Sequence, residues 1–116
     1  MPLVARWRPL HTLPTRRGRD AMPGAYELAD GEKRLIYIGQ STKDVPNRIR
    51  QHLGRSTCIR ERARYWRYLH SKVPQAEEAL QLERHLKHHG KLPLCNRARP
   101  GCRGGRRRYA ERSGGT

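Results

Sequence analysis

Nearly all the patterned apolar residues lie between residues 23 and 96, so we expect the hydrophobic core to come from this one stretch. The chain has 116 residues, of which 34% are hydrophobic, so it has room for one small domain. Residues 1–22 carry five arginines and one acid without sustained periodicity. Residues 98–116 are rich in arginine and glycine and cannot bury enough surface to fold alone. We therefore expect a core domain at residues 23–97 between two mobile or loosely docked basic arms, 1–22 and 98–116.

The charge of the chain points to a polyanionic partner. Lysine and arginine number 26 against 10 acidic residues, and the formal net charge is +16. Such a balance attracts nucleic acid before other partners. There is no apolar run long enough to span a membrane, and the first residues do not resemble a signal peptide.

Cysteine usage predicts a reducing, cytoplasmic compartment. The three cysteines are Cys58, Cys95 and Cys102, and none belongs to a C-x-x-C unit, so we expect unpaired thiols. A zinc site that uses Cys95 and Cys102 with His88 and His89 is a poor match to metal-ligand spacings.

The core block predicts three strands and two helices. Strands are expected at residues 24–28, 34–39 and 65–69, and helices at 45–53 and 75–89. The pair Asp30-Gly31 is typical of a hairpin turn between the first two strands. Asp44 is expected to cap the first helix, and Gly54 and Gly90 to end the two helices. The order predicts an α/β fold of the α+β kind, with a small three-stranded antiparallel sheet flanked by helices.

Two tyrosines and a helical pair are the first candidate site residues. With an even number of loop residues in the hairpin, Tyr26 and Tyr37 share one face, where they could also form a simple cross-strand pair. Arg48 and His52 are four residues apart on the first helix and project from the same stripe. Taken alone, such a helical pair is typical of a solvated flank.

One glutamate interrupts the apolar side of the second predicted helix. At 100° per residue, Glu83 falls near the middle of an arc of apolar residues, which are Ala76, Ala79, Leu80, Leu82 and Leu86. A carboxylate aimed at a core is costly unless a cation or strong donors meet it. Two interpretations follow, a buried ion pair with an arginine or a metal-binding carboxylate of an active site.

At these positions the chain resembles the GIY-YIG nucleases. The tripeptides Gly24-Ala25-Tyr26 and Tyr37-Ile38-Gly39 are similar to the two that name the family, with Ala25 in place of the usual isoleucine. Arg48 and His52 stand where the family has its helical arginine and histidine. Glu83 matches its metal-binding glutamate, and Asn96 matches its late asparagine. The resemblance covers residues 23–97.

The resemblance implies an endonuclease that hydrolyses phosphodiester bonds in DNA with one divalent cation, Mg²⁺ or Mn²⁺. It implies that Glu83 holds the ion and that Arg48 binds a non-bridging phosphate oxygen. Tyr26 and Tyr37 would orient the attacking water, and one of them would accept its proton.

The resemblance gives His52 and Asn96 supporting roles. His52 would share the proton transfer or hold a tyrosine in place. Asn96 would fix the geometry around the metal or a tyrosine by hydrogen bonding.

Other basic residues are candidates for contact with the nucleic-acid backbone, namely Lys43, Arg50, Arg60, Arg64 and Arg67. Contacts with phosphate position a backbone and carry no direct sequence information. Two other functions stay open, a non-catalytic nucleic-acid-binding protein and a small basic ribosome-associated protein. The form of the DNA, which includes branched and single-stranded substrates, and the oligomeric state are also open.

Overall fold

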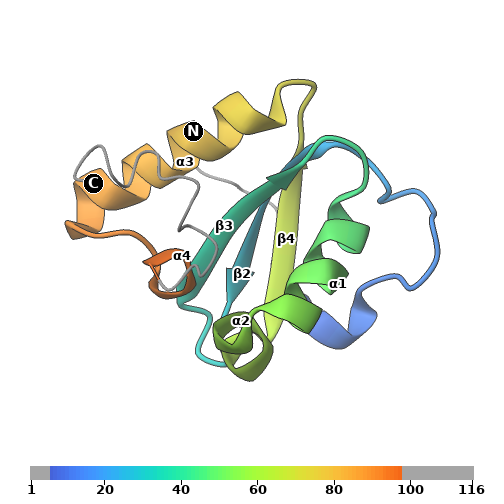
Figure 1. Ribbon diagram of the computed structural model, residues 1–116, viewed down its shortest axis with the longest axis horizontal. Coiled ribbons are helices and arrows are strands. Elements are labelled where there is room, and N and C mark those ends of the chain that lie inside the picture. Colours follow the sequence, from blue (N-terminus) through green and yellow to red (C-terminus); the bar gives the residue numbers. More distant parts are fainter. Residues whose placement is uncertain (1–5, 98–116) are drawn as a thin grey trace.

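An antiparallel sheet of four strands forms the centre of the molecule (Figure 1). The computed structural model describes residues 6–97. The strands are β1 (Arg8–Pro9), β2 (Gly24–Ala29), β3 (Leu35–Ser41) and β4 (Tyr65–His70), in the order β1-β4-β2-β3. The helices are η1 (Leu10–Thr12), α1 (Val45–Arg55), α2 (Thr57–Arg62), α3 (Pro74–His89) and α4 (Leu94–Arg97). The predicted α+β class is confirmed, with the short β1 as an additional strand at one edge.

The predicted register of the β2–β3 hairpin is confirmed. Tyr26 pairs with Gly39 and Leu28 pairs with Tyr37, so even positions on β2 share a face with odd positions on β3. The turn is longer than a two-residue Asp-Gly turn. The strand register shifts after Leu28, so Ala29 pairs with Leu35 and residues 30–34 form the turn. The Asp30 carboxylate accepts hydrogen bonds from the backbone N–H groups of residues 32 and 34 and shapes this wider turn.

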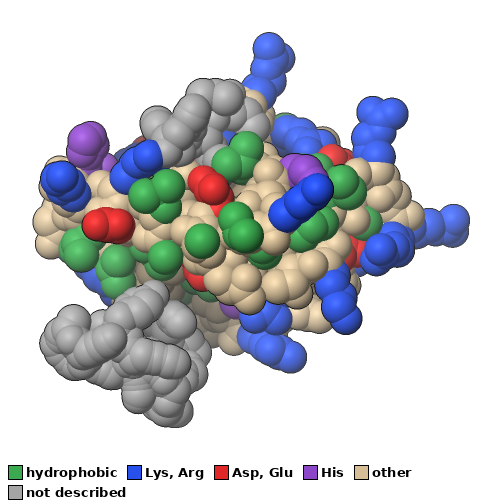
Figure 2. Space-filling view, turned by 90° about the horizontal axis from the view of Figure 1, so that it is seen from above, with side chains coloured by type: hydrophobic (Ala, Val, Ile, Leu, Met, Phe, Trp, Pro, Cys, Tyr) green, Lys and Arg blue, Asp and Glu red, His purple; other side chains and the backbone are tan. Residues whose placement is uncertain are grey.

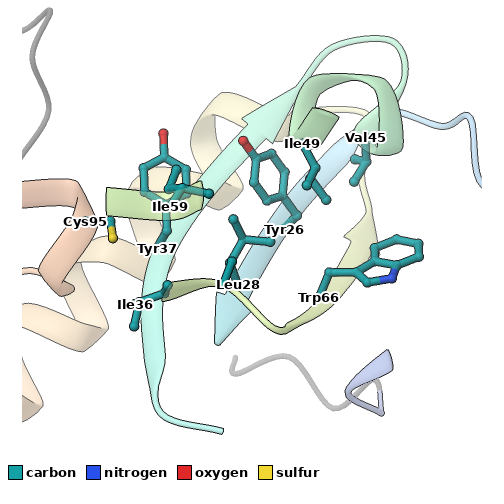
Figure 3. Packing of buried hydrophobic residues seen from close by; sticks show 10 residues of the cluster. Tyr26, Leu28, Ile36, Tyr37, Val45, Ile49, Ile59, Trp66 and Cys95 are labelled. Carbon is teal, nitrogen blue, oxygen red and sulfur yellow. The ribbon is translucent and has the colours of Figure 1, made fainter. Parts of the chain in front are cut away.

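One face of the sheet carries the hydrophobic core (Figure 3). Tyr26, Leu28 and Trp66 project from the strands and are fully buried. Val45 and Ile49 of α1 and Ile59 of α2 belong to the same buried cluster, so these two helices cover this face. The Val45–Ile49 spacing is one helical turn, which explains why α1 presents a single apolar stripe.

Part of the segment expected as a loosely docked arm is packed against the sheet. Residues 8 and 9 pair with β4, and the Trp66 indole N–H donates to the Thr12 hydroxyl oxygen at 3.3 Å. The Arg8 guanidinium lies 4.1 Å from the centre of the Trp66 ring and pairs with Asp20 at 3.3 Å. The expected loose attachment is therefore wrong for these residues, because an aromatic surface on β4 holds them. The expected arm at 98–116 lies outside the described residues.

The first two helical boundaries differ from the prediction. Helix α1 continues through Gly54, which does not end it, and closes at Ser56, whose N–H donates to the His52 carbonyl. The Ser56 hydroxyl in turn accepts from the Ile59 N–H and caps α2, which the sequence reasoning missed. Asp44 caps α1 as predicted, and Gly90 ends α3 in the left-handed conformation with φ of 75°. None of the helices in residues 6–97 is long and apolar enough to cross a lipid bilayer.

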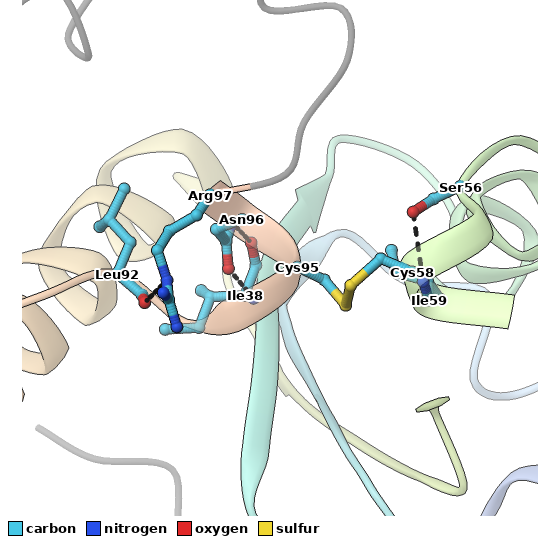
Figure 4. The surroundings of a disulfide bond; sticks show 8 residues. All are labelled: Ile38, Ser56, Cys58, Ile59, Leu92, Cys95, Asn96 and Arg97. Carbon is cyan, nitrogen blue, oxygen red and sulfur yellow. Dashed lines mark hydrogen bonds between the residues drawn. A yellow bond between two sulfur atoms is a disulfide. The ribbon is translucent and has the colours of Figure 1, made fainter. Parts of the chain in front are cut away.

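The expectation of unpaired thiols is wrong for two cysteines. Cys58 of α2 and Cys95 of α4 form a disulfide, with their Cα atoms 5.6 Å apart (Figure 4). The disfavoured zinc site loses Cys95 as a ligand, and Cys102 lies outside the described residues. Among residues 6–97 no three histidine, cysteine or acidic side chains gather in a way that could hold a metal ion. The disulfide instead joins the short α4 to α2.

We expect replacement of Cys58 by serine to lower the free energy of unfolding by about 4 kcal/mol, since the bond closes a loop between residues 37 apart. Urea titrations of the wild-type and variant proteins measure this loss, and Cys102→Ser is the matched control. An unfolding midpoint that reductant leaves unchanged in the wild-type protein would contradict the disulfide.

Candidate active site

The two motif tyrosines lie next to each other on the core face of the hairpin. Their ring centroids are 6.1 Å apart, and both phenol oxygens point to the same side in Figure 3. The Tyr26 ring crosses Gly39, where an added Cβ would come within 2.5 Å of it and within 2.8 Å of the Tyr37 ring. Gly24 has a comparable role, because a Cβ there would lie 2.2 Å from the Leu69 carbonyl oxygen of β4. The glycines of both tripeptides are therefore required by close packing.

Helix α1 brings an imidazole against these phenols. The His52 ring centroid lies 5.2 Å from that of Tyr37 and 6.3 Å from that of Tyr26. The predicted stripe of Arg48 and His52 therefore faces the tyrosines. The Arg48 guanidinium donates to Gln51 at 3.2 Å, and its charge lowers the pKa of Tyr26, so it lies within electrostatic reach of that hydroxyl.

A small hollow lies beside Arg48. It has a volume of about 170 Å³ and is formed by the β3–α1 loop and the first turns of α1, with Lys43 and Gln51 in its lining. Arg50, two residues further along α1, does not line this hollow. Its guanidinium donates to the Pro14 carbonyl and to Asn47 at 3.2 Å.

Burial strongly favours the neutral form of Tyr26. It raises the pKa of this phenol well above 10, Tyr37 raises it further, and Arg48 opposes the shift. The Tyr26 hydroxyl is buried, and a hydrogen bond with the neighbouring Tyr37 phenol contributes to the rise of its pKa. A neutral phenol in this position can donate a hydrogen bond but is a poor proton acceptor.

The expectation that Glu83 points into the core is wrong. The buried or half-buried residues of α3 are Pro74, Glu77, Glu78, Gln81, Leu82, Arg84 and His85, and Glu83 is exposed. At 100° per residue, Glu83 lies opposite the middle of this set. The acid whose charge raises the pKa of Tyr26 is the half-buried Glu78. The sequence analysis did not identify Glu78 as a candidate, because only tertiary structure shows that its charge acts on Tyr26.

Asn96 holds the strand that carries Tyr37. Its side-chain carbonyl accepts from the Ile38 N–H at 2.9 Å, and its amide donates to the Ile38 carbonyl at 3.0 Å (Figure 4). Because β3 is an edge strand, these two groups face outward and have no neighbouring strand. Asn96 thus satisfies both and fixes the centre of the Tyr37-Ile38-Gly39 segment.

The remaining basic candidates divide into two groups. Lys43, Arg60 and Arg64 are exposed on the surface, where phosphate can reach them. Arg67 pairs with the buried Glu27 at 2.7 Å and lies 3.9 Å from the centre of the Trp7 ring. Its contact with nucleic acid stays a prediction, and part of its charge is used by the buried carboxylate.

Comparison with known proteins agrees with this geometry. A family model described as the GIY-YIG catalytic domain matches residues 22–94, which is more than half of the chain. The chain belongs to the GIY-YIG family. No curated protein and no solved structure matches it. Domains of this family are generally endonucleases that act on nucleic acid and depend on a divalent metal.

The donor set near the tyrosines fits a hydrated divalent cation. Mg²⁺ keeps several of its waters and is usually bound through one or two carboxylates together with substrate oxygens. A single glutamate of α3 can hold such an ion, and the charge of Glu78 on this helix acts on the Tyr26 hydroxyl. Residues of this kind suit Mg²⁺ or Mn²⁺ better than zinc, which favours nitrogen and sulfur ligands.

We expect Gly39→Ala to lower the free energy of unfolding by about 1–3 kcal/mol, because the added methyl group meets the fully buried Tyr26 ring. Gly54→Ala is the matched control, since an added Cβ there has nothing within 4 Å. In the helix interior this control should stabilise by up to about 1 kcal/mol. Equal effects of the two substitutions in thermal unfolding would contradict the close packing of Tyr26 on Gly39.

We expect Tyr26→Phe to lower the free energy of unfolding at pH 7 by no more than about 1.5 kcal/mol, since the hydrogen-bond partner of the lost hydroxyl is another neutral phenol, that of Tyr37. Above pH 10 the unfolded wild-type chain ionises Tyr26 whereas the folded protein resists ionisation, so the wild-type protein loses stability there. The phenylalanine variant lacks this loss. Urea titrations at pH 7 and at alkaline pH measure the difference, and parallel pH profiles would show that the Tyr26 pKa is unshifted.

Proposed function

We propose that this chain is a metal-dependent endonuclease that hydrolyses phosphodiester bonds in DNA. The observation that supports this most is the convergence of Tyr26, Tyr37 and His52, whose ring centroids lie within 6.3 Å of one another. Arg48 and Glu78 both act on the Tyr26 hydroxyl electrostatically, so a cation and an acid flank the same point. Membership of the GIY-YIG family supports a role for this group of residues in cleavage of nucleic acid.

Arg48 is proposed to bind the phosphate that is cleaved. Its planar guanidinium can donate two parallel hydrogen bonds to non-bridging oxygens and stabilise the charge that develops in the transition state. The hollow beside it, lined by Lys43 and Gln51, offers room for the neighbouring part of the DNA backbone. The single contact of Arg48 with the neutral Gln51 leaves its charge available.

Tyr26 and Tyr37 are proposed to have different roles in handling the water. The raised pKa of Tyr26 keeps its hydroxyl protonated, so it donates a hydrogen bond that orients the attacking water or a phosphate oxygen. Tyr37 is then the proposed acceptor of the proton from water. The ring centroids of Tyr37 and His52 are 5.2 Å apart, so His52 would take up the phenol proton of Tyr37 or hold this phenol in position. Asn96 acts as a positioning residue through its two hydrogen bonds with Ile38.

A glutamate of α3 is proposed to hold the divalent cation. When bound, Mg²⁺ or Mn²⁺ would neutralise phosphate charge and favour departure of the leaving oxygen. The charge of Glu78 raises the pKa of Tyr26, which favours Glu78 for this role. The spacing of the family motif favours Glu83 instead. Of the two, Glu78 is our first candidate, because its charge reaches the tyrosines and Glu83 lies on the exposed side of the helix.

The surrounding positive charge is proposed to provide affinity for the DNA backbone without sequence preference. Lys43, Arg60 and Arg64 are the exposed candidates among the described residues. A cytoplasmic location also remains a proposal, and it now rests on the nucleic-acid partner alone. The Cys58–Cys95 disulfide removes the argument from free thiols.

We expect Glu78→Gln to reduce the nicking of plasmid DNA in Mg²⁺ by at least about 100-fold, while retardation of DNA in chelator is unchanged. Glu83→Gln is the matched control and should retain most of the activity. The reverse result would assign the metal to Glu83. Absence of nicking by the wild-type protein in Mg²⁺ and in Mn²⁺, with retardation intact, would favour a non-catalytic binding protein and contradict the proposed function.

A further inference from the structure

A second, larger hollow lies at the other end of α1. It has a volume of about 560 Å³ and is lined by η1, the end of α2, the β2–β3 turn and the first residue of β4. Sites for small organic ligands typically have volumes of about 300–1,000 Å³, so the hollow can take a group as large as a nucleotide. None of the residues placed at the active site lines it.

Backbone hydrogen bonds fix the walls of this hollow. The Leu10 N–H donates to the Arg64 carbonyl at 2.8 Å, and the Arg64 N–H donates to the Ala29 carbonyl at 2.8 Å. Pro9 pairs with Tyr65 at the beginning of β4. The segment that contains Pro9 and Leu10 is therefore held to α2 and the sheet, and the site is formed before a ligand binds.

Two arginines give the hollow a positive charge that no acid neutralises. Arg60 donates to the Leu53 carbonyl at 3.1 Å, and Arg64 donates to the Ala63 carbonyl at 2.8 Å. These acceptors are neutral, and neither guanidinium forms an ion pair with a carboxylate in residues 6–97. The acids that flank Gly31 of the lining, residues 30 and 32, are both paired with Arg34 instead. The ligand that this charge favours is an anion.

Apart from the arginines and His11, the side chains of the lining are apolar or aromatic. Leu10, Ala63 and Tyr65 contribute to it, and Tyr65 is half-buried at the beginning of β4. A phosphate alone would leave this surface uncovered, whereas a nucleotide can place its phosphate at the arginines and its base against the tyrosine. A base that is stacked and paired within a duplex cannot enter a hollow, so the chemistry fits an unpaired nucleotide.

The hollow lies along the same helix as the phosphate-binding candidate Arg48. Arg60 contacts the carbonyls of residues 53 and 54, about 9 Å along the α1 axis from Arg48. Neighbouring charges along one DNA strand are about 3.4 Å apart in projection on the helix axis. One strand can therefore reach both places within a few nucleotides.

We propose that this hollow binds an unpaired nucleotide of the DNA substrate, close to the phosphate that is cleaved. Arg60 and Arg64 bind its phosphate, and Tyr65 stacks with its base. The substrate class that follows is DNA with a single-stranded tail, flap or bulge beside the duplex. This inference rests on the proposed function only in taking DNA as the partner, because the hollow contains none of the proposed catalytic residues.

Fluorescence anisotropy in chelator tests the proposal without catalysis. The probes are a blunt DNA duplex and the same duplex with an unpaired tail at either end of one strand. Wild-type protein should bind the tailed duplex at least about fivefold more tightly, and Arg64→Ala and Tyr65→Leu should each reduce this preference by about 5–20-fold. Binding of the blunt duplex should fall by a smaller factor, about twofold to threefold for Arg64→Ala, because this arginine is also a candidate for general contact with the DNA backbone.

Arg62→Ala is the matched control, because Arg62 is exposed on the same helix but does not line the hollow. It should weaken binding of both probes equally, as loss of a general phosphate contact does. Equal effects of Arg64→Ala or Tyr65→Leu on the two probes, in variants whose melting temperature is unchanged, would overturn the proposal. Plasmid nicking by the same proteins tests the proposed function separately. Nicking without a preference for the tailed duplex would overturn only the nucleotide site, whereas absence of nicking would contradict the proposed function.

Discussion

The close approach of Tyr26 to Gly39 is the contact on which the candidate site depends. The phenol ring occupies the space that a side chain at position 39 would fill, so the two strands can bring both tyrosines to one point. Any larger residue would displace a ring that has no accessible surface. The same burial keeps the Tyr26 hydroxyl neutral. Packing and protonation at this position therefore have a single cause, which is removal of the phenol from water.

Local patterns predicted the parts of the fold that depend on neighbouring residues. The β2–β3 register followed from the alternation of side chains, and the Arg48–His52 stripe followed from helical spacing. The Cys58–Cys95 bond joins residues 37 apart, and the Asn96–Ile38 hydrogen bonds join residues 58 apart. Nothing in the spacing of these residues shows that they meet, because tertiary structure alone brings them together. The resemblance to the family indicated Asn96, but not that its partner is the edge of β3.

Helix α3 shows where hydrophobic periodicity fails. A helical wheel assumes that the most apolar side is buried, yet Leu80 and Leu86 are 39% and 46% exposed while the polar Gln81 is buried. The face seen in Figure 2 has apolar side chains at the surface between acidic ones. The buried ion pair considered for Glu83 does occur, but it joins Glu27 and Arg67 within the sheet. Hydropathy does not identify which polar residues form buried contacts, so the helical wheel wrongly placed Glu83 on the buried side of α3.

The two hydrogen bonds of Asn96 also have a consequence for self-association. An exposed edge strand can pair with the edge of another molecule and begin aggregation. At Ile38 the N–H and C=O groups that such pairing would use are already occupied by the asparagine amide. Cys95, the residue before Asn96, forms the disulfide with Cys58, and this bond holds α4 against the edge of β3. The residue that supports the Tyr37 strand therefore also blocks pairing of a second chain with the middle of β3.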